Sequence, residues 1–189
     1  MAVEIRGLCK AFGAHKVLEN FCATLPESGV VEVCGRSGAG KTTLFRILLG
    51  LETADSGEIA GLEGWRLGAV FQEDRLLPHR SAVDNVRFVC GAGEAEILSH
   101  LEQVGLGAQA GQRVCDYSGG MRRRAAIVRA VLYPCRALLL DEPFKGLDGE
   151  ARRDAASYIR RHAPEATVLC VTHDREDAAA LEAESVVEM

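Results

Sequence analysis

The stretch Gly35-Arg36-Ser37-Gly38-Ala39-Gly40-Lys41-Thr42 follows the pattern G-x-x-x-x-G-K-T, the phosphate-binding loop called Walker A. The β-branched run Gly29–Cys34 comes directly before it, and the helix-compatible run Thr43–Leu49 comes directly after it. In such a loop, glycines let several backbone N–H groups converge on one anion at the positive end of the next helix. Lys41 would reach the β- and γ-phosphates, and the Thr42 hydroxyl would bind Mg²⁺. The strand–loop–helix context therefore predicts a nucleoside triphosphate site rather than an ordinary glycine-rich turn.

A second chemical signal follows the apolar run Ala137–Leu140, which leads directly into Asp141 and Glu142. A short, continuous apolar run is typical of a central parallel strand that is buried on both faces. In a chain with a phosphate loop, Asp141 matches the Mg²⁺-organising aspartate of Walker B. Glu142, at the carboxyl edge of the sheet, is placed to orient or deprotonate an attacking water. The two motifs together predict Mg²⁺-dependent hydrolysis of a nucleoside triphosphate.

Size, composition and charge restrict the class of protein. The 189 residues suffice for one substantial core, or for a core with a small inserted subdomain. A content of 48% hydrophobic and 26% charged residues is ordinary for a globular protein. The formal net charge of −5 argues against nucleic acid as a partner. No apolar run is long enough to cross a bilayer, and the N-terminus lacks a signal peptide, so we expect a cytoplasmic chain. The seven cysteines form no C-x-x-C pair and are expected to be small buried hydrophobic residues.

The order of strand and helix patterns predicts an α/β fold. Apolar runs typical of strands alternate with helical patterns, which favours a parallel sheet with helices on both faces. The helices between about residues 81 and 133 are expected to form a subdomain inserted into this sheet. Strands are expected at residues 3–8, 17–25, 30–34, 67–71, 137–140 and 166–171, with a last strand beginning at 186–187, and helices at 43–49, 94–104, 121–133, 151–162 and 174–181.

Six motifs occur in one order along the chain, and together they resemble the nucleotide-binding domain of ATP-binding cassette (ABC) proteins. The resemblance extends from about Val3 to the C-terminus. It implies a P-loop NTPase fold with a mainly parallel central sheet, an N-terminal antiparallel β part and an inserted α-helical subdomain. It also implies one nucleotide-binding domain over residues 1–189, with the helical subdomain at about 80–133. The motifs are Walker A at 35–42, Gln72 after Val70-Phe71, Tyr117-Ser118-Gly119-Gly120-Met121, Walker B at 137–142, Gly146-Leu147-Asp148 and Val171-Thr172-His173-Asp174.

The resemblance implies a role for each matching residue in binding and hydrolysing ATP with Mg²⁺. Phe12 would stack on adenine, with a place in the core as the alternative for this side chain. Gln72 would contact Mg²⁺ and the attacking water, Glu142 would act as general base, and His173 would contact the γ-phosphate. The implied catalytic residues are Lys41, Gln72, Glu142 and His173, and the implied metal ligands are Thr42, Gln72 and Asp141. The implied nucleotide-binding residues of the same copy are Phe12, Gly35, Arg36, Ser37, Gly38, Ala39, Gly40, Lys41, Thr42 and Thr43.

The resemblance also implies partners. Ser118-Gly119-Gly120 would bind the γ-phosphate of an ATP held by a second copy, and the loop with Asp148 would cross the interface of a head-to-tail homodimer that sandwiches two ATP molecules. An integral membrane permease would receive movement relayed by Gln72 and would hold the chain on the inner face of the cell membrane. A solute-binding protein would take part indirectly. No nucleic acid partner is implied, because Arg122-Arg123-Arg124 is interpreted as a solvated, dimer-facing stretch of helix.

Residues 70–78 and 141–148 resemble the ATPase subunits of bacterial importers, particularly the nitrate/sulfonate/taurine group. A soluble ABC-type ATPase that serves assembly or translation is the alternative. Three features depart from the family pattern, and the first is that the helical insert is compact. Tyr117 stands where leucine is usual, and the chain ends soon after Val187, before the closing strands and helices that members commonly carry.

Overall fold

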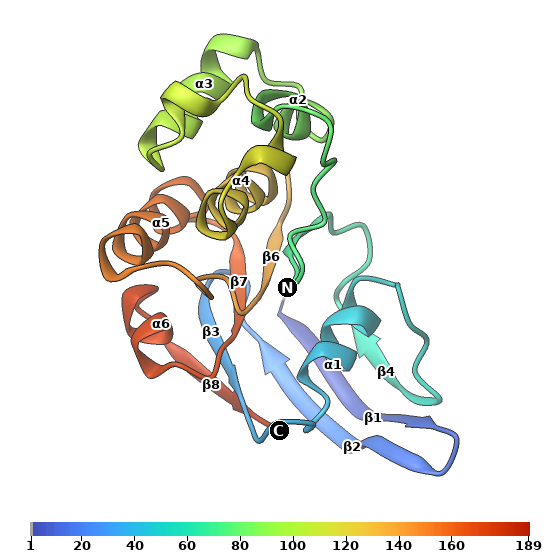
Figure 1. Cartoon of the computed structure of the whole chain (residues 1–189). Helices are drawn as coiled ribbons and strands as arrows, with labels where there is room; N and C mark the ends of the chain where they lie inside the picture. Colours follow the sequence, from blue (N-terminus) through green and yellow to red (C-terminus); the bar gives the residue numbers. More distant parts are fainter. Residues whose placement is uncertain (1) are drawn as a thin grey trace.

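A five-stranded parallel sheet forms the centre of the computed structural model, which describes residues 2–189 (Figure 1). The strands lie in the order β5-β6-β7-β3-β8, and each neighbouring pair is parallel. This arrangement confirms the α/β fold and the parallel central sheet expected from the sequence. The strand bounds are β3 (Gly29–Cys34), β5 (Leu67–Val70), β6 (Ala137–Asp141), β7 (Thr167–Val171) and β8 (Ser185–Glu188).

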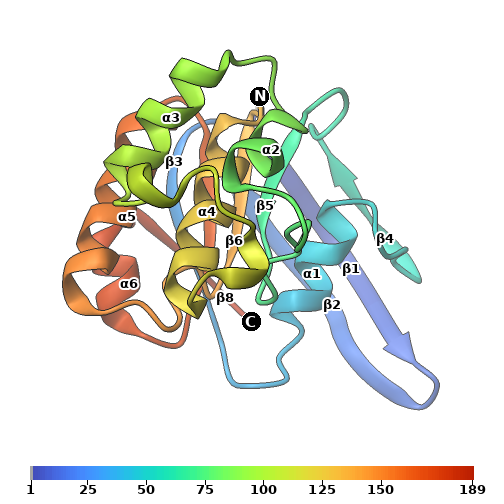
Figure 2. The ribbon, with the colours of Figure 1, turned by 45° about the horizontal axis from the view of Figure 1, so that its top comes forward.

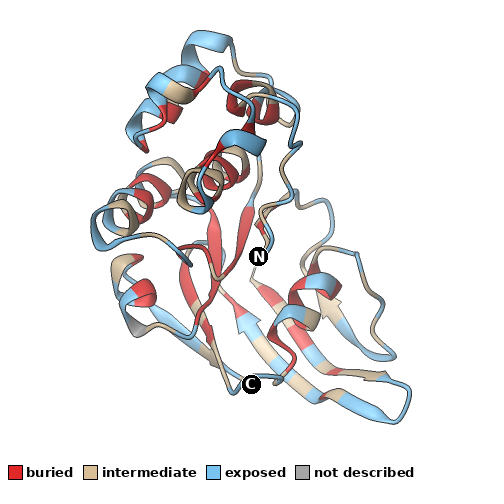
Figure 3. Cartoon of the chain, viewed as in Figure 1, coloured by how far each residue is buried: buried red, intermediate tan, exposed pale blue. Residues whose placement is uncertain are grey.

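Strands β6 and β7 are buried along their whole length, as Figure 3 shows. Successive side chains of a strand point to opposite faces, so Leu138 and Leu140 of β6 belong to one hydrophobic core and Leu139 to another. Because both faces are covered, every position of such a strand requires an apolar residue. This explains why the two strands are continuous apolar runs in the sequence.

Helices cover both faces of the parallel sheet (Figures 1 and 2). Phe45 of α1 packs in the core that contains Leu139, whereas Ile127 of α4 and Ile159 of α5 pack in the core on the opposite face. Helix α6 follows β7, and Leu181 at its end belongs to the same core as α4 and α5. The helix bounds are α1 (Lys41–Leu48), α4 (Gly119–Leu132), α5 (Gly149–His162) and α6 (Arg175–Ala180).

A three-stranded antiparallel sheet in the order β2-β1-β4 forms the N-terminal part. Strands β1 (Val3–Phe12) and β2 (His15–Leu25) are the two expected strands, extended to a shared turn. Strand β4 (Ser56–Ala60) was not predicted, because its small and polar residues carry no apolar alternation and only pairing with β1 makes it a strand. At Gly57 the two backbones approach closely, since a Cβ there would lie 2.6 Å from the Gly7 carbonyl oxygen. Only glycine fits at this position.

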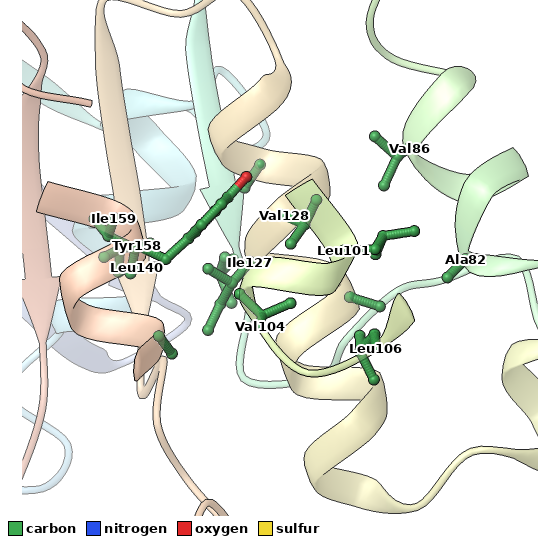
Figure 4. Close-up of a cluster of buried hydrophobic side chains, with 14 of the residues drawn as sticks. Ala82, Val86, Leu101, Val104, Leu106, Ile127, Val128, Leu140, Tyr158 and Ile159 are labelled. Atoms are coloured by element: carbon green, nitrogen blue, oxygen red, sulfur yellow. The ribbon is translucent and has the colours of Figure 1, made fainter. Parts of the chain in front are cut away.

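The helical part of the chain lies between β5 and β6 and consists of α2 (Ala82–Arg87), α3 (Glu94–Gln103) and α4, with short 3₁₀ turns between α3 and α4. Side chains from these helices and from α5 meet in one cluster (Figure 4). No separate range was predicted for helix α2, because its six residues are too few to show a helical period in the sequence. Its start is fixed by Ser81, whose Oγ accepts a hydrogen bond from the Asp84 amide at 3.0 Å.

The expectation for the cysteines is only partly correct. All seven are free, and Cys170 is buried in β7. Cys22 and Cys115 are exposed, so the expectation of burial is wrong for these two. Cys22 lies on β2, an edge strand with many exposed residues, and Cys115 lies in a short 3₁₀ turn. None of the helices within residues 2–189 combines the length and apolar composition that crossing a bilayer requires.

Tyr117, which stands where the family usually has leucine, is 3% exposed and belongs to the core under the helical part. Its hydroxyl donates a hydrogen bond to the Gln109 carbonyl oxygen at 2.7 Å. Burial also raises the pKa of the Tyr117 phenol, so this group stays a neutral donor. The Tyr117 hydroxyl, which a leucine would lack, is therefore not left unpaired, because Gln109 in the 3₁₀ turn Gly107–Gln109 accepts its hydrogen bond.

Tyr117→Phe is expected to lower the free energy of unfolding by about 1 kcal/mol, because it leaves the Gln109 carbonyl without its donor. Urea unfolding followed by circular dichroism measures this change. Tyr133→Phe is the matched control, since the Tyr133 hydroxyl has no hydrogen bond within residues 2–189. Equal stabilities for the two variants would contradict the role given to the hydrogen bond.

Candidate active site

A pocket of about 410 Å³ opens at the carboxyl ends of β3, β6 and β7. Carboxyl ends of parallel strands share one edge of a sheet, which is where ligands bind in open α/β folds. The sequence-predicted residues that line it are Ser37, Gly38, Ala39, Gly40, Lys41, Thr42, Thr43, Gln72, Asp141, Glu142 and His173. Residues from four separate segments of the chain are thus brought together in one cavity.

The glycine-rich loop has the backbone shape that a phosphate cradle requires. Gly38 and Gly40 have φ values of 81° and 98°, which lie in the left-handed region. Gly40 is also tightly enclosed, since a Cβ there would lie 2.9 Å from the Val17 carbonyl oxygen. Lys41 is 6% exposed, and its Nζ donates to the Gly35 carbonyl at 2.7 Å and to the Arg36 carbonyl at 3.1 Å. The loop therefore holds its own lysine at the cavity wall, close to where a triphosphate would lie.

Thr42 and Asp141 form the part of the site that suits a divalent cation. Thr42 Oγ1 donates to Asp141 Oδ2 at 3.1 Å, although 99 residues separate the two in sequence. A hydroxyl and a carboxylate are the hard oxygen ligands that Mg²⁺ prefers, and Mg²⁺ usually takes only one or two from the protein. The donor set therefore fits Mg²⁺ bound together with nucleotide phosphates.

The carboxyl of Asp141 is subject to opposing effects on its charge. The residue is 5% exposed, and burial raises the pKa of its carboxyl. The hydrogen bond from Thr42 and the positive charges of Arg123 and Lys41 act in the opposite direction. Without a cation, the ionised carboxylate is therefore held in surroundings that disfavour its charge.

Glu142 and His173 face each other at the other side of the pocket. Glu142 has a φ of 52°, an uncommon conformation for a residue other than glycine. Glu142 comes directly after the end of β6, and it lines the pocket. His173 Nε2 lies 3.6 Å from Glu142 Oε1, and its side chain is 55% exposed. A carboxylate and an imidazole thus stand where they can act on the same water or phosphate.

The interpretation of Arg122-Arg123-Arg124 as a solvated, dimer-facing stretch is wrong for Arg123. This side chain is 6% exposed and donates at 2.6 Å to the carbonyls of Phe71 and Gln72. It also forms an ion pair with Asp74 at 3.2 Å. Arginine reaches these carbonyls because its planar fork carries several donors. Arg123 therefore fixes the backbone of the loop that presents Gln72, a role that sequence reasoning missed because an arginine on a helix is usually solvated.

The two neighbouring arginines also bond within the chain. Arg122 donates to the Tyr117 carbonyl and Arg124 to the Val104 carbonyl, each at 2.6 Å. All three arginines thus form hydrogen bonds within the chain, to carbonyl oxygens in or next to the helical part.

Several predicted residues lie outside the pocket. Phe12 is 49% exposed at the end of β1, which excludes the alternative that placed it in the core. Ser118 and Asp148 are exposed and act as caps: Ser118 accepts from the Met121 amide, and Asp148 accepts from the amides of Glu150 and Ala151. The signature motif and the Asp148 loop are nevertheless neighbours, because a Cβ on Gly120 would lie 3.3 Å from Leu147.

Lys145 lines the pocket although the sequence analysis did not select it. The residue lies in the turn after Glu142, and its amide donates to the Glu142 carbonyl at 3.2 Å. The sequence signal that could have identified Lys145 is its place between Glu142 and the Gly146-Leu147-Asp148 motif. The turn after Glu142 is short, so its residues stay close to Glu142. A second lysine therefore lines the same pocket as Lys41.

Asp141→Asn is expected to raise the Tm of nucleotide-free protein in the presence of a chelator, because it removes a charge that the fold disfavours. The folded-state pKa of Asp141 lies above its unfolded value. The cost of its charge is therefore full above the folded-state pKa and disappears as the pH falls and the carboxyl becomes protonated. The gain in Tm should shrink between about pH 7.5 and about pH 4.

Thermal unfolding across this pH range tests the expectation, with the exposed Asp154→Asn as control. The Asp141 variant should also lose at least about 100-fold in nucleotide hydrolysis. A gain in Tm that persists unchanged at low pH would contradict the assignment of the strained charge to Asp141.

Comparison with known proteins gives a consistent result. A family model described as ABC transporter matches residues 18–145. The aliphatic sulfonates import ATP-binding protein SsuB 3 of Pseudomonas savastanoi pv. phaseolicola is 39% identical over 188 residues, which cover 95% of this chain and 70% of that protein. The sulfate/thiosulfate import ATP-binding protein CysA of Acinetobacter baylyi is 38% identical over 201 residues, which cover 94% of this chain and 57% of that protein.

A similar fold also occurs among solved structures. A bacterial Atm1-family ABC exporter with ATP bound superposes with a TM-score of 0.87 over 100% of this chain and 37% of the exporter chain. The sequence identity is 22%, so this likeness speaks for the fold alone. It agrees with the P-loop NTPase architecture expected from the sequence.

Proposed function

The chain belongs to the ABC transporter family, and from this premise we propose that it is the ATP-binding and ATP-hydrolysing subunit of a bacterial solute importer. The observation that carries the proposal is the assembly of Lys41, Thr42, Asp141, Glu142 and His173 around one pocket. The curated relatives are import proteins for aliphatic sulfonates and for sulfate or thiosulfate. A small sulfur oxyanion is therefore the solute class that we propose.

Hydrolysis in this site depends on positioning and on charge neutralisation rather than on covalent chemistry. The amides of the glycine-rich loop and the Lys41 ammonium would hold the β- and γ-phosphates. Mg²⁺, when bound by Thr42 and Asp141 with help from Gln72, would neutralise further phosphate charge. Glu142 would accept the proton of the attacking water, and His173 would hold the γ-phosphate opposite it.

The single chain offers a second, separate surface for phosphate. Ser118, Gly119 and Gly120 begin α4, where backbone N–H groups and the helix dipole favour an anion, yet none of them lines the pocket. Ser118 and Asp148 are both exposed. We therefore propose a head-to-tail homodimer in which this surface closes over the ATP of the other copy. Residues 1–189 would act as one nucleotide-binding domain with a helical subdomain at about 80–133.

An apolar groove of about 280 Å³ is the proposed docking surface for the membrane permease. Leu49 and Leu51 line it together with Val89 and Tyr133 of the helical part. Its lining also includes Phe71, the residue before Gln72, so an occupant would touch the segment that would present Gln72 to the nucleotide. The proposed occupant is a cytoplasmic helix of the permease. This contact would hold the chain on the inner face of the membrane, and a solute-binding protein would act only through the permease.

Glu142→Gln is expected to trap an ATP-bound dimer, because it removes the general base but leaves the phosphate-binding groups intact. Size-exclusion chromatography with MgATP should show a species of twice the mass, and hydrolysis should fall by at least about 100-fold. A variant that hydrolyses ATP at the parental rate would refute the role of Glu142.

Ser118→Arg in the Glu142→Gln background tests the second surface. The added side chain blocks the N-terminus of α4 without touching the pocket, so ATP should still bind but the dimer should not form. Fluorescence titration with an ATP analogue and size-exclusion chromatography separate the two effects. Normal dimers of this double variant would contradict the proposed arrangement.

Leu51→Glu tests the groove, because it places a charge in the apolar lining. Leu51 is 57% exposed, so the substitution should not disturb the fold. Sedimentation with membranes that contain or lack a co-produced importer permease is the measurement. The parental chain should sediment only with permease-containing membranes, and Leu51→Glu should weaken this association while ATP affinity stays unchanged. Glu58→Gln, on the exposed strand β4, is the control. No difference between the two kinds of membrane would favour the soluble ABC-type ATPase instead.

A further inference from the structure

The loop that carries His173 is tied to α6 on both sides of the histidine. Thr172 precedes His173 and is 4% exposed. Its hydroxyl donates to Asp177 Oδ2 at 2.7 Å and accepts from the Asp174 amide at 3.0 Å. Asp174 in turn caps α6 by accepting from the Glu176 amide at 2.9 Å. The side chains of the residues before and after His173 are thus each hydrogen-bonded to the first turn of α6.

Arg152 of α5 completes this network from the opposite side. Its Nη1 lies 2.9 Å from Asp174 Oδ2 and 2.7 Å from Glu176 Oε2, and its Nε lies 3.3 Å from Asp177 Oδ1. One guanidinium therefore faces three carboxylates. The planar fork of arginine can serve several partners at once, whereas lysine offers a single point charge.

Asp177 makes the network costly to break. The residue is 3% exposed, and burial raises the pKa of its carboxyl while Thr172 and Arg152 counteract this effect. Loss of Arg152 would leave a buried carboxylate without its cation. The segment between Thr172 and Asp177 would then have to rearrange, and His173 lies within that segment.

Arg152 of α5 connects the Asp148 loop with the loop that carries His173. Helix α5 begins at its cap Asp148, and Arg152 lies about one turn further along the same helix. The other end of the connection is the His173 imidazole, 3.6 Å from the Glu142 carboxylate. A shift of the Asp148 loop would therefore move Arg152 and, through the three carboxylates, the His173 loop.

We propose that Arg152 is a positioning residue of the hydrolytic site, which holds the His173 loop in the orientation that hydrolysis requires and links this loop to the Asp148 end of α5. The inference rests on the proposed ATPase function and deepens it. Arg152 does not line the nucleotide pocket, so it acts through His173 and not on the nucleotide.

The test compares Arg152→Gln and Arg152→Lys with the parental chain in steady-state ATP hydrolysis and in titration with a fluorescent ATP analogue. The kcat of Arg152→Gln should fall by about 10- to 100-fold, because a displaced catalytic group is costly, while KM and nucleotide affinity change by less than about twofold. Arg152→Lys keeps the charge but not the fork and should recover only part of the rate. Arg153→Gln is the matched control, since Arg153 is exposed and has no partner within residues 2–189.

Non-additivity distinguishes positioning from general destabilisation. In a His173→Ala background, Arg152→Gln should lower the residual rate by less than about twofold, because both changes remove the same contribution. An equal loss in both backgrounds, or a parental kcat for Arg152→Gln, would overturn the proposal.

A milder variant covers the case in which Arg152→Gln does not fold. Asp174→Asn keeps the cap of α6 but removes one carboxylate partner of Arg152, so it should lower kcat with nucleotide affinity unchanged. A parental kcat for folded Asp174→Asn would count against the proposal. A folded parental chain that hydrolyses no ATP would instead refute the proposed function itself.

Discussion

The adjacency of β6, β7 and β3 within the parallel sheet is the constraint on which the site depends. These strands end at one edge of the sheet, so the segments that follow them meet there: the phosphate loop after β3, Asp141 and Glu142 at the end of β6, and His173 beyond β7. The hydrogen bond between Thr42 and Asp141 joins two of these segments directly. Burial on both faces keeps β6 and β7 in place, and this fixes the points from which the loops at their ends begin.

Arginines hold the loops that apolar burial cannot hold. The segments around Gln72 and His173 are polar and contribute few side chains to either core. Arg123 bonds to the backbone of the first segment, and Arg152 bonds to the carboxylates of the second. Each arginine comes from a helix that is itself packed on the sheet. The two helices thus provide fixed points from which a long arginine side chain holds each of the two loops.

Under the proposed function, the phosphate-binding features of the chain lie on two separate surfaces. One surface is the pocket around Lys41, and the other is the exposed start of α4 at Ser118. A helix N-terminus with free amide groups attracts an anion, but the residues of this one do not reach the pocket of the same copy. This geometry supports a site completed by a second copy, in which ATP is part of the interface. Under that arrangement, the bound nucleotide would control association by mass action.

Much of this protein was determined by local sequence. The phosphate loop, the continuous apolar runs of β6 and β7, and the long helices α3, α4 and α5 have patterns that arise within a few residues, so they were predicted close to their observed bounds. The chemistry proposed for Lys41, Thr42, Asp141 and Glu142 also rests on residue types at fixed spacing within two short motifs.

Tertiary structure alone decided the rest. Strand β4 forms because it can pair with the edge of β1. Arg123 and Arg152 are largely shielded from solvent because loops distant in sequence pack against their helices. The exposure of Phe12 and the partners of Tyr117 were decided in the same way. A sequence specifies what a side chain can bond to, but which partners come within reach depends on how separate elements pack, and that information is not local.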